Sequence, residues 1–223
     1  MTTDQRETTP DEGVDSRRCV GSRTRQVLGL IALAVVIALL LRTFVAQTFS
    51  VPSDSMAPTV RPGDRVVVTK IGARSVERGE VIVFDGTTTF APASRDPHES
   101  DGLIGRVLSG VSSTLGINLG EQDYLKRVAA VGGDRVSCTP EGGLVVQGAA
   151  VAEPYLPSGT KACETPFDLQ VPPGRLFVLG DNRAHSADSR AHLGAPGGGM
   201  IPLDDVIGHV SWRYWPLTDL GGL

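Results

Sequence analysis

The chain has 223 residues, a formal net charge of −4, 27 glycines, 15 prolines and only 5% aromatic residues. This length fits one domain of ordinary size with an appendage, and the acidic balance gives no electrostatic case for binding nucleic acid. Because glycine and proline punctuate short strands, the composition favours a mostly β protein over a helix-dense one.

The N-terminal part predicts a tail followed by a membrane span. Residues 1–25 mix acids and arginines with few apolar groups, which is typical of disorder. The uncharged apolar run 27–41 reaches the roughly 20 residues of a transmembrane helix if it extends to 46, so we expect that helix at 26–46. The arginines before it place the N-terminus in the cytoplasm and residues 47–223 outside, at the cell membrane. The alternative is a cleaved secretory signal, although no small-residue cleavage site follows in TFVAQTFSVP.

Short runs rich in β-branched and apolar residues recur after the apolar segment, and most are bounded by Gly, Pro or Asp. These runs are DRVVVTK, EVIVFDG, YLKRVAAVGGDRVSC, GLVVQG, GRLFVLGD and DVIGHVSWRYW. Residues 85–102 predict a polar surface loop. Residues 103–120 carry apolar side chains at helical spacing, which indicates either a helix packed on the sheet or an amphipathic helix resting on the membrane.

The positions of the three cysteines agree with the predicted membrane topology. Cys19 falls on the cytoplasmic side, whereas Cys138 and Cys163 fall outside, where disulfides persist. A bridge between the latter two would close a loop that contains a hairpin signal at 141–143, and the alternative is two unpaired buried cysteines. No Cys or His cluster has the spacing of metal ligands, so we expect no metal and no cofactor.

A general base is hard to find among the histidines but conspicuous among the lysines. None of the four histidines has a context that indicates a Ser-His-Asp arrangement, and the chain has only three lysines. By strand alternation, Lys126 shares one face with Tyr124, Val128 and Ala130, so its amine would be partly desolvated. Desolvation lowers a lysine pKa from about 10.4 and yields a neutral base able to activate a serine. The alternative is a lysine snorkelling from the sheet edge.

Four blocks that occur in order carry a resemblance to a known family. They are PSDSMAPTV, RPGDRVVV, YLKRVAAVGGDRV and VPPGRLFVLGDNRAHSADSR. They resemble the sequence boxes of bacterial type I signal peptidases, which are membrane-anchored serine–lysine endopeptidases with a β-rich catalytic domain. The match covers most of residues 49–215 and begins directly after the apolar segment, as it does in the family.

The resemblance assigns roles to individual residues. The serine before the methionine, Ser55, would be the nucleophile, and Lys126 would be its general base. Ser53 resembles the side-chain donor of the oxyanion hole, with the Ser55 backbone N–H as the second donor. Ser186 resembles the serine that hydrogen-bonds the lysine amine and orients it. Any one of these serines could instead cap a turn.

Further residues match supporting positions of the family. Those that resemble its ion-pairing residues are Arg127, Asp181, Asp188 and Arg190, and the nearby Gly180 and Asn182 would shape the turn. Those that match the substrate groove are Phe49, Val51, Pro52, Val60, Tyr124 and Leu125, for which ordinary core packing is the alternative. The chain departs from the family pattern at Ala130 and Gly132 and in a glycine-rich insertion after SADSR.

The resemblance implies a protease that removes N-terminal signal peptides from exported preproteins after Ala-x-Ala-like sites. Its partners would be those preproteins and membrane lipid, with no nucleic acid. One alternative is a dedicated Ser/Lys maturase that acts on a few precursors. Another is a non-catalytic, membrane-tethered β-module that binds extended peptides.

Overall fold

The computed structural model describes residues 16–90 and 123–223, which form two separate units divided between Arg42 and Thr43. The first unit contains all of α1 (Ser16–Phe44) except its last two residues, and the second contains the strands. The expected tail of residues 1–15 and the helical segment 103–120 lie outside the described residues. The structure places residues 16–25, the second part of the expected tail, in helix α1, and their several arginines are good helix formers.

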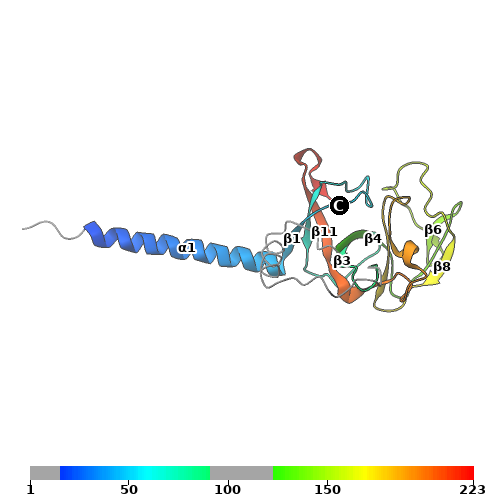
Figure 1. The fold of residues 1–223 in the computed structure, drawn as a ribbon, viewed down its shortest axis with the longest axis horizontal. Helices are drawn as coiled ribbons and strands as arrows, with labels where there is room; N and C mark the ends of the chain where they lie inside the picture. Colours follow the sequence, from blue (N-terminus) through cyan, green and yellow to red (C-terminus); the bar gives the residue numbers. More distant parts are fainter. Residues whose placement is uncertain (1–15, 91–122) are drawn as a thin grey trace, which may run out of the picture. The chain divides into compact units, whose positions relative to one another are not determined.

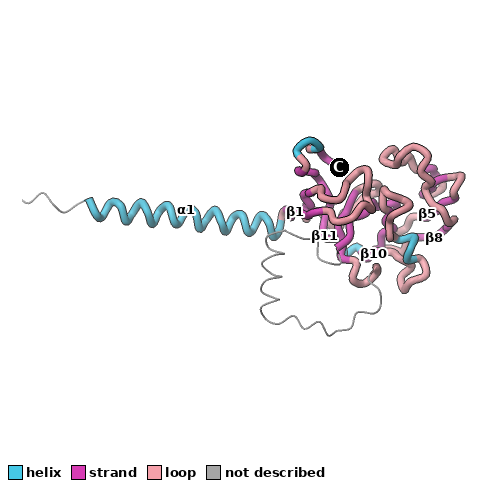
Figure 2. Tube along the Cα trace, turned by 45° about the horizontal axis from the view of Figure 1, so that its top comes forward, coloured by secondary structure: helices cyan, strands magenta, loops and turns pink. Residues whose placement is uncertain are grey.

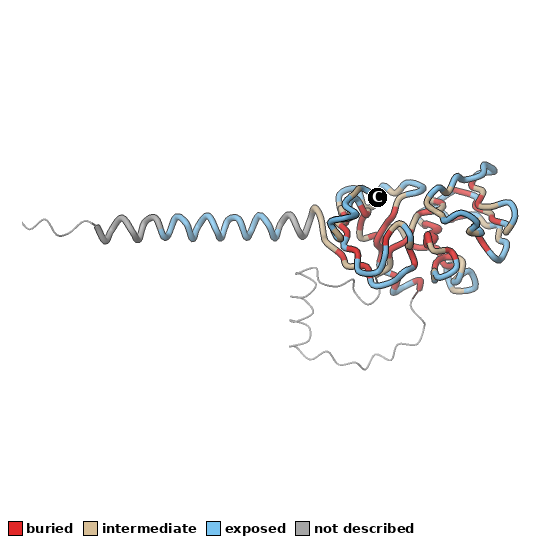
Figure 3. Tube along the Cα trace, turned by 90° about the horizontal axis from the view of Figure 1, so that it is seen from above, coloured by how far each residue is buried: buried red, intermediate tan, exposed pale blue. Residues whose placement is uncertain are grey.

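Helix α1 differs in its bounds from the expected span at 26–46. The helix begins at Ser16 instead of residue 26. It ends at Phe44, shortly before strand β1 (Ala46–Ser50) begins. The described side chains of α1, from Thr24 to Leu39, are exposed (Figure 3). Across the parts of the chain that the structure describes, no helix presents a stretch that is both long and apolar enough to cross a membrane.

The second unit is mostly β, as predicted, and its larger sheet has eight antiparallel strands. Their order is β1-β2-β11-β3-β4-β9-β10, with β12 paired to β11. Beyond β1, the bounds are β2 (Arg65–Thr69), β3 (Val81–Asp85), β4 (Asp123–Val131), β9 (Arg175–Leu179), β10 (Ile201–Pro202), β11 (Val206–Trp215) and β12 (Gly221–Gly222). Strands β3 and β4 lie between the β1 and β11 end and the β6 and β8 end of the unit (Figure 1).

The smaller sheet has four antiparallel strands in the order β7-β6-β5-β8. They are β5 (Arg135–Thr139), β6 (Gly143–Val146), β7 (Ala149–Ala150) and β8 (Phe167–Gln170). The predicted hairpin joins β5 to β6, and Gly143 has the positive φ of +73° that favours glycine in such a turn. The predicted bridge between Cys138 and Cys163 is confirmed, with an S–S distance of 2.07 Å.

Loops make up much of the second unit and include three short 3-10 turns (Figure 2). These are η1 (Ser189–His192), η2 (Leu203–Asp205) and η3 (Leu217–Asp219). The buried side chains form three clusters, and both faces of β4 contribute to them: Leu125 packs into one, and Val128 and Ala130 pack into the other two. The central strand that carries Lys126 is therefore enclosed on both faces.

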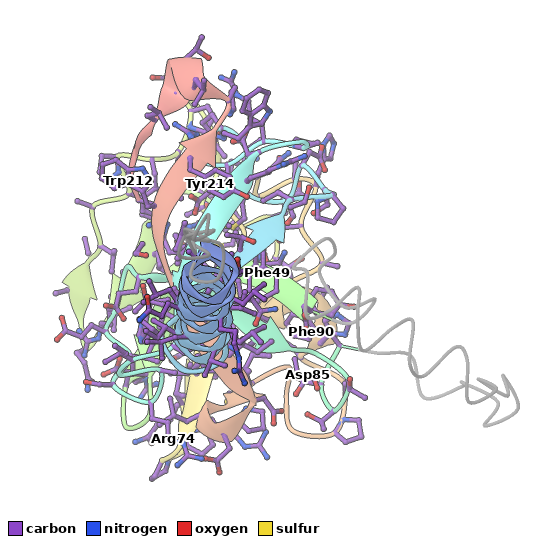
Figure 4. The ribbon with its side chains drawn as sticks, turned by 90° about the vertical axis from the view of Figure 1, so that its left-hand side faces the viewer. Phe49, Arg74, Asp85, Phe90, Trp212 and Tyr214 are labelled. Carbon is purple, nitrogen blue, oxygen red and sulfur yellow. A yellow bond between two sulfur atoms is a disulfide. The ribbon has the colours of Figure 1, made fainter. Side chains whose placement is uncertain are left out.

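The C-terminal end of β11 and the residues just after it expose large apolar side chains to solvent, unlike the enclosed strand β4. Trp212 and Trp215 are 49% and 48% exposed, and Leu217 and Leu220 just beyond are 67% and 53% exposed. Figure 4 shows Trp212 and Tyr214 on this strand, away from Phe49 on β1. We call these four exposed residues the β11 patch.

Candidate active site

The two residues expected to carry the chemistry lie in direct contact. Lys126 Nζ donates a hydrogen bond to Ser55 Oγ at 2.7 Å, although the residues are 71 positions apart in the sequence. The same amine donates to the Leu125 carbonyl oxygen at 3.0 Å. Lys126 is 3% exposed and Ser55 is 8% exposed, so the contact is largely shielded from water.

Ser55 is held by the turn-rich segment between β1 and β2. The Ala57 N–H donates to the Asp54 carbonyl and the Val60 N–H donates to the Met56 carbonyl, at 2.9 and 3.0 Å. Met56 and Val60 are fully buried in the cluster beneath the turn. Because its neighbours are anchored in the core, the Ser55 hydroxyl has a defined position on an otherwise exposed loop.

Lys126 is placed by the register of β4, where it stands opposite Ile82 of β3. Its burial beside apolar neighbours lowers the pKa of the Lys126 amine from 10.5 to about 8, and the carboxylates of Asp188 and Asp181 oppose part of that effect. The expectation of a desolvated amine is confirmed. The snorkelling alternative is excluded by the position of Lys126 in the middle of an enclosed strand.

Ser53 lies beside the Ser55 hydroxyl. The two Oγ atoms are 3.3 Å apart, and Ser53 is exposed whereas Ser55 is buried. The hydroxyl of Ser53 therefore lies next to that of Ser55, on a residue that solvent can reach.

Ser186 is near the pair but does not contact the amine as expected. Both residues are described, yet no hydrogen bond joins Ser186 Oγ to Lys126 Nζ, because the amine donates to Ser55 Oγ and the Leu125 carbonyl instead. The Ser186 hydroxyl oxygen is buried and has no hydrogen-bond partner among the described residues. It packs against Gly180, where an added Cβ would stand 2.1 Å from Ser186 Oγ and 2.5 Å from the Ser55 carbonyl oxygen.

The four expected ion-pairing residues form two pairs around this turn. Arg127 binds Asp181 with two hydrogen bonds of 2.8 and 2.6 Å, and Arg190 binds Asp188 with two of 2.9 and 2.8 Å. Asp188 also accepts from the Gly180 N–H at 3.0 Å. Both carboxylates are almost fully buried, so each pair fixes part of the turn that faces Ser55.

The expected groove residues divide into two groups. Phe49, Val51, Val60 and Leu125 belong to the buried cluster under Ser55, with at most 6% of each exposed. For these four, the core-packing alternative describes the structure, because their side chains are already covered. Pro52 is exposed and Tyr124 is half-buried, so these two are the accessible members of the set.

Sequence reasoning missed two contacts in the site. Thr59 donates to Asp181 at 2.6 Å, which ties the Ser55 turn to the Arg127 pair. Asn182 donates its backbone N–H to the Ser55 carbonyl at 3.1 Å and its side-chain amide to the Asp54 carbonyl at 3.2 Å. The only sign in the sequence that Thr59 belongs to the site was its place in the same block as Ser55. Its partner, Asp181, lies more than a hundred residues further along the chain.

Within residues 16–90 and 123–223, no group of His, Cys, Asp and Glu side chains could together hold a metal ion. Ser55, Lys126 and their surroundings provide a hydroxyl, an amine whose lowered pKa leaves it partly neutral, and nearby hydrogen-bond donors, a set of groups that suffices for acyl transfer.

Comparison with known proteins identifies the family. Residues 24–215 match the family model described as signal peptidase, peptidase S26. A signal peptidase I of Mycobacterium tuberculosis is 35% identical over 221 residues, covering 90% of this chain and 75% of that protein. A signal peptidase I of Leptolyngbya laminosa is 30% identical, covering 97% and 92%. A crystal structure of a signal peptidase I from Enterococcus faecalis is 21% identical and has a TM-score of 0.39, covering 61% of this chain and 97% of that one. The chain belongs to the signal peptidase S26 family of serine endopeptidases.

Proposed function

We propose that this protein is a signal peptidase I that cleaves signal peptides from exported preproteins with Ser55 as nucleophile and Lys126 as general base. The observation that carries the proposal is the buried 2.7 Å contact between the Lys126 amine and the Ser55 hydroxyl. A lysine near pKa 8 is partly neutral at physiological pH, so its lone pair can accept the serine proton.

The chemistry runs in two acyl-transfer steps. Lys126 takes the proton from Ser55 Oγ as that oxygen attacks the scissile carbonyl, and the resulting oxyanion accepts hydrogen bonds from the Ser53 hydroxyl and the Ser55 N–H. Lys126 then returns the proton to the leaving amine as the peptide C–N bond breaks. Water, deprotonated by the same amine, attacks the ester and releases the signal peptide with Ser55 regenerated.

Around the dyad, the supporting residues maintain this geometry. The two ion pairs, Arg127 with Asp181 and Arg190 with Asp188, hold the turn against the Ser55 carbonyl. Ser186 packs beside Gly180 in the same region, and we expect its hydroxyl to help orient the Lys126 amine. Pro52 and Tyr124 would contact an extended peptide bound beside Ser55, with cleavage after small Ala-x-Ala-like residues.

The active unit would act on the outer side of a membrane, with residues near 26–44 as its anchor and residues from Ala46 onward as the catalytic domain. The uncharged run 27–41 after a group of arginines supports this topology. The disulfide between Cys138 and Cys163 supports an oxidising compartment. Contact with lipid is supported by the β11 patch, because exposed tryptophans favour the membrane interface.

A substrate panel tests the proposal. The full-length protein in detergent is incubated with several preproteins that have Ala-x-Ala sites, and cleavage is followed by mass spectrometry. Cleavage should be lost in Ser55→Ala and Lys126→Ala and kept in two controls away from the site, Ser75→Ala in an exposed loop and Lys70→Ala just after β2. Activity that survives Lys126→Ala at neutral pH would exclude the dyad. Cleavage of a single precursor would indicate a dedicated maturase, and binding without cleavage a peptide-binding module.

A further inference from the structure

A third buried ion pair, in addition to Arg127–Asp181 and Arg190–Asp188, was not among the expected supports of the dyad. The carboxylate of Glu153 pairs with the guanidinium of Arg183, and the two side chains are only 8% and 3% exposed. Burying two charges is costly, so such a pair adds little net stability compared with well-packed apolar residues. Its presence therefore calls for a role beyond holding the fold together.

Arg183 uses its remaining donors to join two segments of backbone. Its Nε donates to the Gly180 carbonyl at 3.0 Å, and its Nη1 donates to the Ala162 carbonyl at 2.8 Å. Glu153 accepts from both terminal nitrogens of the same guanidinium. Because this group is planar and rigid, fixing it at Glu153 and Ala162 also fixes the Gly180 carbonyl.

Gly180 packs directly against the backbone carbonyl of Ser55, the proposed nucleophile. Its Cα faces the Ser55 carbonyl and Ser186 so closely that not even a methyl group would fit between them. Two residues further on, the Asn182 N–H donates to the same Ser55 carbonyl. A shift of the Gly180 backbone would therefore move Ser55 relative to Lys126.

The segment that supplies Glu153 reaches the site from a second direction. We call residues 151–163, which contain no helix or strand, the bridging loop. Its Tyr155 hydroxyl donates to Glu153 at 3.0 Å, and the Arg127 guanidinium lies 4.0 Å from the centre of the Tyr155 ring. Arg127 follows Lys126 on β4 and pairs with Asp181, so the loop contacts Arg127 as well as Arg183.

The bridging loop is itself anchored covalently. It ends at Cys163, whose disulfide partner Cys138 lies on β5, and both sulfurs are buried. Ala162, whose carbonyl accepts from Arg183, is the residue just before Cys163. The loop can therefore act as a fixed support instead of following the turn as it moves.

We propose that Glu153 is a positioning residue of the protease: through Arg183 it holds the Gly180 turn against Ser55 and thereby keeps the Ser55 hydroxyl and the Lys126 amine in contact and dry. The inference rests on the dyad proposed above. It assigns the bridging loop a part in the reaction although none of its residues touches substrate.

The test replaces the carboxylate by an amide of the same shape, Glu153→Gln, in the full-length protein in detergent. Its matched control is Asp168→Asn, which breaks the bidentate but exposed pair of Asp168 with Arg135 on the smaller sheet. On a signal-peptide substrate, kcat should fall by about 100-fold in Glu153→Gln, since a displacement of about 1 Å costs that much. KM should stay unchanged, and Asp168→Asn should match the wild type.

A second readout does not depend on activity. The chain has only three lysines, so labelling them with ¹³C at Cε gives few NMR signals, and each can be titrated. If the turn loosens, water reaches Lys126, and its pKa should rise from about 8 towards 10.5. Loss of the Glu153 charge acting through space would shift that pKa downward, so the sign separates positioning from direct electrostatics.

Tyr155→Phe removes only the hydroxyl that supports Glu153. It should lower kcat and raise the Lys126 pKa, both by less than Glu153→Gln does. This variant decides the matter if Glu153→Gln does not fold. The proposal is overturned if kcat and the Lys126 pKa match the wild type, or if only the melting temperature falls. The dyad is tested separately, by cleavage with the wild type and loss of cleavage in Ser55→Ala. If the wild type does not cleave the substrate, the proposed function fails. The NMR titration of Lys126 then still tests whether Glu153 positions the turn.

Discussion

Under the proposed mechanism, the pH dependence of cleavage should follow the titration of a single amine, that of Lys126. Only the neutral form can accept the Ser55 proton, and burial places the pKa at about 8. We expect kcat/KM to rise about tenfold per pH unit below that value and to level off above it. The measurement is a pH series on a soluble signal-peptide substrate.

Lys126→Arg is the control for this profile, because a guanidinium stays protonated across the whole range. It should be inactive at every pH. A midpoint near 10.5 in the wild type would contradict the argument that the amine is desolvated.

Gly180 is the position where we expect a single added methyl group to lower activity most strongly. Its absent side chain leaves room for Ser186 Oγ and the Ser55 carbonyl, which would lie 2.1 and 2.5 Å from a Cβ. Gly180→Ala should therefore lower kcat by about 100-fold or more through displacement of the nucleophile.

The matched control is Gly194→Ala, where nothing lies within 4 Å of the added carbon. Both variants are compared by steady-state kinetics after circular dichroism has shown that they are folded. Equal kcat values in the two would mean that the turn tolerates a shift at Gly180.

Resemblance and strand alternation together predicted the residues of the dyad, but not their hydrogen bonds. Lys126 was expected on a partly apolar face, and that face is buried. Ser186 was expected to bind the amine, which instead bonds to the carbonyl of its own neighbour, Leu125. Side-chain rotamers of this kind depend on local packing, which a sequence motif does not encode.

At the scale of elements, strand β11 depends on a glycine at its irregular point. The pairing with β3 changes register between Val206 and Gly208, and a Cβ at Gly208 would lie 2.4 Å from the Thr69 carbonyl of β2. Gly208→Ala should lower the free energy of unfolding by about 1–3 kcal/mol, as overpacking does in cores.

Gly222→Ala on β12 is the comparison for that variant, since its nearest neighbour would be 3.7 Å away. Urea unfolding of both proteins gives the difference. A Gly208→Ala protein as stable as the Gly222→Ala protein would show that the sheet can spread at this point.

The apolar runs predicted β2, β3, β4, β5, β6, β9 and β11, because alternation and turn residues are local signals. Strand β1, which overlaps the predicted membrane span only at Ala46, was not identified, and neither was β8. Their sequences AQTFS and FDLQ have few apolar residues, so only pairing with β2 and β5 makes them strands. The strand order and the register shifts also had no local signal.

At the scale of the whole molecule, the first unit should matter only for substrates held in a membrane. A protein that begins at Thr43 retains every strand of the second unit. It should cleave a short soluble peptide at the wild-type rate and a preprotein in vesicles about 100-fold more slowly, because tethering raises the effective concentration.

The soluble peptide is the internal control, because both substrates are given to the same truncated protein. Equal loss on both would indicate that residues 1–42 support the fold of the second unit. No loss on either would contradict anchoring by this segment.

The sequence alone determined the family and the mostly β class and predicted Ser55 and Lys126 as the reacting pair, because ordered motifs and strand periodicity are local features of the linear chain. Only the tertiary structure decided that Phe49 and Val60 are core residues, that Gly180 touches the nucleophile and that Glu153 reaches the site through Arg183. Such contacts join positions far apart in the sequence, and their formation depends on how the two sheets and their loops pack.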